Sequence, residues 1–224
     1  MRIGLLSSWP WDLARGSGTA RFLLDLERAL SREGAGVTRI DADLDPADYA
    51  AFVEGRIAWN RDLALDPRLR GLDVLFALDL DGFELPPPPA GPPKVVCPQA
   101  VFADLAGTEP EPYRGLLLRQ AEAERRNVRS AAALITPSRY AAEGIVRAYR
   151  ADPSKVRVIP HGFDVEEWQT MVESDGRLRH PRRARRSSGP CGGHRQGPLR
   201  DPAPRGAAGS GVAAGSKVRL ARDG

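Results

Sequence analysis

A glycine-rich turn is the first stretch of the sequence whose residue types could hold a charged ligand. Gly16, Ser17, Gly18 and Thr19 stand directly before a segment with helical spacing of apolar residues. Bare backbone amides and the positive end of a helix dipole favour a phosphate group at such a turn. The dinucleotide fingerprint G-x-G-x-x-G fails, because Arg21 stands where its third glycine belongs. The residues alone leave two readings open: a phosphate-binding turn and a plain capping turn.

Two carboxylates and one histidine offer further chemistry. Asp79 and Asp81 follow an apolar run, where paired carboxylates could bind substrate hydroxyl groups or act as a base. An Asx-type turn before Gly82 explains the same residues equally well. His161 is the only histidine before residue 176 and is either a general base or part of a loop or hinge.

Ser138 and Arg139 stand at the start of a predicted helix. The Ser138 hydroxyl is placed to cap the helix, and Arg139 could pair with a phosphate or carboxylate or simply face water. No group of His, Cys, Asp and Glu residues has the spacing of a metal site, so we expect no metal and no other cofactor. No G-x-S-x-G nucleophile motif is present.

The elements that must position these residues alternate regularly. Short apolar runs predict strands, and apolar residues at i, i+3 and i+4 predict helices. The expected strands are 2–6, 37–40, 73–78, 94–97, 134–136 and 156–159, and the expected helices are 20–32, 45–61, 113–130 and 138–151. This alternation predicts an α/β fold with a doubly wound, mainly parallel Rossmann-like sheet and helices on both faces. Ligands of such sheets bind beyond the carboxyl ends of the strands, which places residues 136–140 and 160–164 at the expected site.

Charge is unevenly distributed along the chain. Residues 176–224 contain twelve Lys and Arg against two Asp and Glu, whereas residues 1–175 carry a net charge of −6. From residue 173 onward large apolar residues are rare and no periodicity is visible, so we expect a folded domain over 1–172 and a disordered basic low-complexity tail over 173–224. A nucleic-acid interaction would have to depend on this tail alone, so nucleic acid is not the expected partner. One hypothesis is that the tail is out of frame, with the reading frame lost between Glu173 and Arg179.

Cysteine content and hydropathy favour a cytoplasmic protein. Cys97 and Cys191 give no disulfide framework, and the apolar run at the N-terminus is too short for a signal peptide. No stretch approaches the roughly 20 apolar residues that a membrane span needs.

Three stretches together resemble the N-terminal domain of GT-B fold, family 4 type glycosyltransferases. They are GSGTARFLLDLERALSREGAGVTRI, LITPSRYAAEGIVRAYRADPSKVRVIP and HGFDVEEW, and the resemblance covers about residues 1–168. Such enzymes have two Rossmann-like domains that face a cleft. The N-terminal domain binds mainly the acceptor, with its Gly-rich turn near the donor diphosphate, and the other domain holds the nucleotide sugar. The resemblance implies metal-free transfer with retention of anomeric configuration.

Carried onto this sequence, the resemblance implies a role for each candidate. The donor-phosphate candidates are Gly16, Ser17, Gly18, Thr19, Ser138 and Arg139; the acceptor-site candidates are Asp79, Asp81 and Gln99; and the interdomain hinge is His161, Gly162 and Asp164. Members of the family often have a catalytic histidine after the strand that matches 94–97, but Pro98, Gln99 and Ala100 stand here, so no catalytic residue is assigned.

The pattern of a second Rossmann-like domain is missing after Trp168. We therefore expect this chain to be inactive alone, with an unknown acceptor and an unidentified nucleotide-sugar donor as the substrates of a full-length member. Two alternatives remain: a non-catalytic binding module that uses the uncovered cleft face, and a nucleic-acid binder that uses the basic tail. A dehydrogenase is disfavoured by the failed glycine fingerprint.

Overall fold

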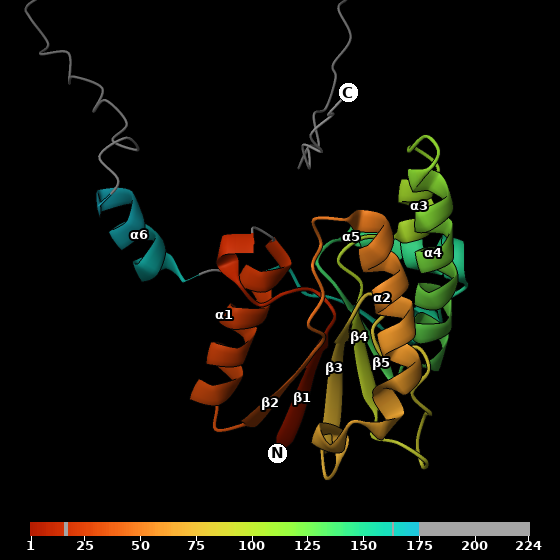
Figure 1. Ribbon diagram of the computed structural model, residues 1–224. Helices are drawn as coiled ribbons and strands as arrows, with labels where there is room; N and C mark the ends of the chain where they lie inside the picture. Colours follow the sequence, from red (N-terminus) through yellow and green to blue (C-terminus); the bar gives the residue numbers. More distant parts are fainter. Residues whose placement is uncertain (16–17, 163, 175–224) are drawn as a thin grey trace, which may run out of the picture. The chain divides into compact units, whose positions relative to one another are not determined.

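The computed structural model describes residues 1–15, 18–162 and 164–174, and in that part of the chain six parallel strands form one sheet (Figure 1). Along the sheet the order is β2-β1-β3-β4-β5-β6, so the direction of winding reverses between β1 and β3. A reversal of this kind is the switch point at which doubly wound folds bind ligands. The strands are β1 (Arg2–Ser7), β2 (Gly36–Asp41), β3 (Val74–Leu78), β4 (Lys94–Cys97), β5 (Ala133–Thr136) and β6 (Val156–Val158).

Helices lie on both faces of the sheet, which confirms the predicted fold class. Figure 1 shows α1 on one side of the strands, and α2 and α4 on the other. The α-helices are α1 (Gly18–Arg32), α2 (Tyr49–Asp62), α3 (Phe102–Ala106), α4 (Tyr113–Ser130), α5 (Arg139–Tyr149) and α6 (Val165–Ser174). Short 3-10 turns are η1 (Leu13–Arg15), η2 (Leu63–Leu65), η3 (Pro67–Leu69) and η4 (Pro153–Lys155).

Local side-chain caps set where several helices begin. The Asp48 carboxylate accepts a hydrogen bond from the backbone N–H of Ala51 at the start of α2, and the Ser138 hydroxyl accepts one from Ala141 at the start of α5. Each cap satisfies a backbone donor that has no partner within the helix. At its other end α5 stops at Arg150, whose φ of 55° is left-handed.

The two faces of the sheet are covered unequally. Leu75, Val96 and Leu134 point into the main core beneath α2, α4 and α5 and are almost fully buried. On the opposite face, Phe76 and Ile135 are only partly buried and pack around a small cluster with α1. Parallel sheets usually bury both faces. Here the α1 side of strands β3 to β5 is only partly covered, which leaves room for a cavity on that face.

Some sequence-based expectations require correction. The expected tail began at residue 173, but Glu173 and Ser174 belong to α6, while residues 175–224 lie outside the described part. Helix α6 forms because the Asp164 carboxylate accepts hydrogen bonds from the backbone N–H groups of Glu166 and Glu167. The short helix α3 was not expected either, and β6 ends at Val158, one residue earlier than predicted. Among the described helices, none is both long and apolar enough to cross a lipid bilayer.

Candidate functional site

The candidate site lies at the edge of the sheet where all strands end. Because the strands are parallel, Ser7, Leu78, Cys97, Thr136 and Val158 end at the same edge. The loops that follow these strands contain most of the residues singled out from the sequence. Two groups form there: an open one around α1 and a buried one around the loop after β3.

Two adjoining cavities, of about 430 and 290 Å³, mark the open group. Both are bordered by Phe22 on α1 and by His161 and Gly162 after β6. The larger cavity extends over Phe76 and Ile135, on the face of the sheet that α1 covers only partly. The smaller cavity opens beside Gly18 at the start of α1. The structure thus brings part of the predicted phosphate turn next to part of the predicted hinge.

His161 is held by aromatic stacking. Its ring lies on the ring of Phe22, with centroids 4.3 Å apart and planes inclined by 22°. Partial burial lowers the pKa of His161 below its ordinary value, which favours the neutral imidazole at pH 7. A neutral ring beside both cavities can accept or donate a hydrogen bond, and its stacking fixes where it can do so.

The other hinge and turn residues have distinct surroundings. Asp164 caps α6 and lies 3.8 Å from the Arg32 guanidinium. Gly18 has open space around the position of a Cβ atom, so a ligand can approach its backbone. Gly16 and Ser17 lie outside the described residues, and Thr19 is half-buried in the first turn of α1.

Ser138 and Arg139 stand apart from the two cavities. The Ser138 hydroxyl is the cap of α5, as predicted from the sequence, and the Arg139 side chain is exposed at the first residue of that helix. Neither residue lines the cavities beside α1. Ser138 and Arg139 follow β5, so they lie at the same carboxyl edge of the sheet as the other candidate residues.

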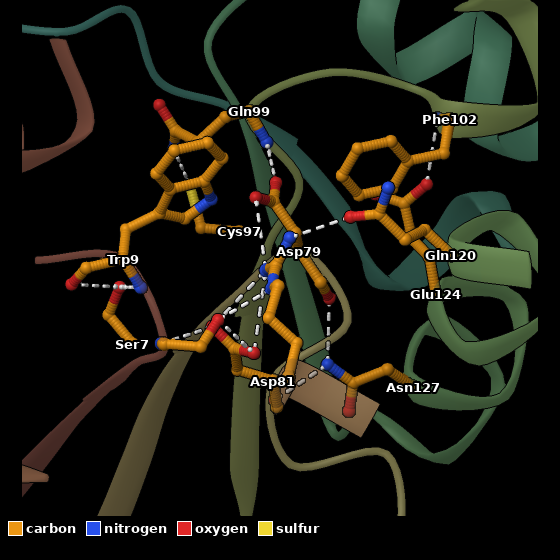
Figure 2. A network of polar contacts seen from close by, with 12 residues as sticks. Ser7, Trp9, Asp79, Asp81, Cys97, Gln99, Phe102, Gln120, Glu124 and Asn127 are labelled. Atoms are coloured by element: carbon orange, nitrogen blue, oxygen red, sulfur yellow. Dashed lines mark hydrogen bonds and ion pairs between the residues drawn. The ribbon is translucent and has the colours of Figure 1, made fainter. Parts of the chain in front are cut away.

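Asp81 is fully buried and anchors the loop after β3 (Figure 2). Its carboxylate accepts hydrogen bonds from the backbone N–H of Ser8 at 2.7 Å and from the Ser8 hydroxyl at 2.8 Å. The Asn60 amide donates to the same carboxylate at 3.4 Å. Asn127 holds the backbone by donating to the carbonyl oxygens of Asp79 and Asp81. These contacts join the ends of β1 and β3 at the switch point.

The positive charge of this network comes from Arg56, which is also fully buried. Its guanidinium donates to the Asp81 carboxylate at 3.4 Å, to the Ser8 hydroxyl at 2.6 Å and to the Gln120 side-chain oxygen at 3.0 Å. The rings of Trp9 and Phe52 lie within 6 Å of the guanidinium carbon. Removing one partner of a buried ion pair leaves the other charge uncompensated and is strongly destabilising. Arg56 thus connects α2 and α4 to the loops after β1 and β3 at the sheet edge.

Asp79 and Glu124 are two more buried acids near Arg56. Burial raises the pKa of Asp79 to about 6 and that of Glu124 to about 8. The second oxygen of the Glu124 carboxylate accepts hydrogen bonds from the Tyr149 hydroxyl and from the Phe102 backbone at 3.0 Å. Its first oxygen has no protein partner among the described residues, consistent with a carboxyl group that keeps its proton at neutral pH.

Gln99 connects the buried network to the open edge. Its backbone N–H donates to the Asp79 carboxylate at 2.7 Å, and its side-chain amide donates to the Cys97 sulfur at 3.2 Å. Gln99 is half-buried, whereas Asp79 and Asp81 are enclosed. Of the three acceptor-site candidates, Gln99 alone has substantial contact with solvent.

Sequence reasoning singled out Asp79 and Asp81 but missed Arg56. The signal was present, because Phe52, Arg56 and Asn60 follow one another at i, i+4 and i+8 and therefore share one helix face. Arg56 and Asn60 are polar residues on the helix face that Phe52 marks as buried, and this pattern predicts that both have buried hydrogen-bond partners. No group of three or more potential metal-ligating His, Cys, Asp and Glu residues occurs in the part of the chain that the structure describes.

Comparison with known proteins gives a family match. The family model described as Glycosyltransferase Family 4 matches residues 16–167, which is more than half of the chain. No curated protein sequence matches the chain. Among solved structures, the crystal structure of Anabaena Alr3699/HepE in complex with UDP matches with 14% identity and a TM-score of 0.37, covering 79% of this chain and 50% of that one. The chain thus spans about half the length of that protein.

Proposed function

The chain belongs to Glycosyltransferase Family 4, and we propose that it carries the acceptor-side domain of an enzyme that transfers a sugar from a nucleotide-sugar donor with retention. One observation supports this most strongly: the start of α1 and the predicted hinge border the same cavity, the smaller of the two at the carboxyl edge of the sheet. This is where a doubly wound sheet binds its ligand.

In this proposal the donor diphosphate approaches the amino end of α1. No acidic residue stands in the first turn of that helix, so its positive end is left for an anion. Gly18 allows close approach of a ligand to its backbone, and the proposal assigns Gly16, Ser17 and Thr19 to the same donor-phosphate group. Ser138 and Arg139 would contact the donor from the next part of the edge, where the exposed guanidinium can pair with a phosphate.

The acceptor would lie nearer to β3 and β4. We assign direct contact with the acceptor to Gln99, because its side chain is only half-buried. Asp79 and Asp81 are enclosed by protein partners, so their part in this proposal is to hold the loops that shape the acceptor site. His161, Gly162 and Asp164 would form the passage to the donor-binding domain of a full-length enzyme.

We further propose that this 224-residue chain does not transfer sugar by itself. One wall of the cleft leaves the charge that develops on the departing nucleoside diphosphate without its main stabilising groups, and such groups are usually the largest single contribution to catalysis.

The assay measures release of nucleoside diphosphate from a panel of UDP- and GDP-sugars. EDTA is present, and water replaces the unidentified acceptor, so hydrolysis of the donor is detected. We expect no release above the rate without protein. Release that follows the protein concentration through purification, and that is lost in a Gly18→Pro variant, would overturn the proposal of inactivity.

A further inference from the structure

Two arginines of α1 converge on one carboxylate supplied by α6. The Arg21 guanidinium donates two parallel hydrogen bonds to the Glu167 carboxylate, at 3.0 and 2.7 Å, and Arg28 donates to the same group at 3.0 Å. Asp25 holds Arg21 from the other side at 2.8 Å. A planar guanidinium that binds a carboxylate through two nitrogens has the geometry that also binds phosphate.

The position of this arginine pair is as informative as its geometry. Arg21 lies three residues after Gly18, and both border the smaller cavity together with His161 and Trp168. The cavity therefore leaves space beside the guanidinium for a ligand larger than a carboxylate. With Glu167 in place, the two arginines are neutralised by Asp25 and Glu167; without it, one positive charge remains.

Helix α6 is held in a way that permits its release. Val165 and Trp168 are more than half exposed, so the helix buries little apolar surface. Its contacts with α1 include the Glu167 ion pairs and the pair between Asp164 and Arg32. Arg21 and Glu167 are each about one-third exposed, and ion pairs in such partly hydrated positions are weak.

We propose that Arg21 and Arg28 form a diphosphate-binding site and that Glu167 occupies it as a built-in competing anion. A diphosphate group that binds there replaces the Glu167 carboxylate and frees α6 from α1. The inference rests on the proposed function only for the choice of a diphosphate as the ligand. It adds a self-blocked state in which the segment after the hinge covers the ligand site.

The test is titration of the full chain with inorganic pyrophosphate, followed by calorimetry. Glu167→Gln should bind pyrophosphate about tenfold more tightly than the wild type, because the apparent affinity is reduced by the fraction of molecules in which the site is blocked. Glu166→Gln is the matched control, since it removes one charge from the same helical turn while leaving the Arg21 contact intact, and it should bind like the wild type.

A second pair of variants tests the cations. Arg21→Gln should lose at least tenfold in affinity, whereas Arg61→Gln, which removes an exposed arginine of α2 that lines neither cavity beside α1, should have a small effect. Hydrogen exchange supplies an independent readout: pyrophosphate should speed exchange of the backbone amides of residues 165–174.

Equal affinity of Glu167→Gln and the wild type, or unchanged exchange in α6 at saturation, would overturn the inference. These outcomes differ from failure of the proposed function. If Glu167→Gln binds pyrophosphate more tightly but no nucleotide sugar binds at all, the anion site stands and the glycosyltransferase assignment of the edge fails. If nucleotide sugars bind at Gly18 and Glu167→Gln does not change their affinity, the glycosyltransferase assignment stands and the self-blocked anion site fails.

Discussion

Replacing Arg56 by methionine is expected to destabilise the folded chain by about 3–5 kcal/mol, the range for removing one partner of a buried ion pair. The substitution leaves the Asp81 carboxylate buried without its cation, and it leaves the Gln120 side-chain oxygen without the guanidinium that donates to it. Methionine keeps the apolar stem that packs beside Trp9 and Phe52. Urea unfolding followed by circular dichroism measures the loss as a lower midpoint at an unchanged slope.

Arg61→Met on the same helix is the matched control. Arg61 is exposed, so its replacement should change the free energy of unfolding by no more than about 0.5 kcal/mol. If Arg56→Met and Arg61→Met unfold at the same urea concentration, the buried network does not hold the sheet edge as described here.

The stability of the wild-type chain is expected to fall as pH rises from about 5 to about 8. Glu124 keeps its proton in the folded state up to a pKa of about 8, whereas the unfolded side chain loses it near its ordinary pKa of about 4.3. Between these values the folded state holds more protons, so the free energy of unfolding decreases by as much as about 1.4 kcal/mol per pH unit. Asp79, with a pKa of about 6, adds to this decrease in the lower part of the range.

Glu124→Gln separates the two acids. The glutamine carbonyl can accept the hydrogen bonds from Tyr149 and Phe102, but it cannot ionise, so the decrease above pH 6 should become shallower. Glu122→Gln, on the exposed side of the same helix, should keep the wild-type slope. Urea midpoints measured between pH 5 and 8.5 give the comparison, and parallel curves for the wild type and Glu124→Gln would contradict the assigned protonation.

The architecture could be predicted from the sequence because its signals are local. The apolar runs at 94–97 and 134–136 are short and bounded, and the stripe of apolar residues on 113–130 has helical spacing. Ser138 was identified as a cap from its position alone, and the structure places its hydroxyl on the Ala141 backbone. The motif-based family assignment is confirmed by the match over residues 16–167.

The site could be predicted only in part, because its contacts join distant residues. Arg56 meets Ser8 and Gln120 across 48 and 64 positions of the sequence, and no local pattern reveals these pairings. The stacking of His161 on Phe22 and the pairing of Glu167 with Arg21 likewise depend on how α1 packs. Asp79 and Asp81 were found as candidates, yet their burial could be seen only once the helices were in place.

The most direct test of the central claim, that the carboxyl edge of this sheet is one wall of a nucleotide-sugar site, is an NMR titration of the ¹⁵N-labelled chain with UDP- and GDP-sugars. Because the described residues form one wall of the proposed site, we predict that they bind at least one of these nucleotide sugars weakly, in the millimolar range. Its chemical-shift changes should concentrate at residues 18–22, 138–140 and 160–164, and residues 34–36 and 71–73 at the opposite edge should remain unchanged. Saturable changes confined to the opposite edge, or none with any nucleotide sugar, would contradict the account.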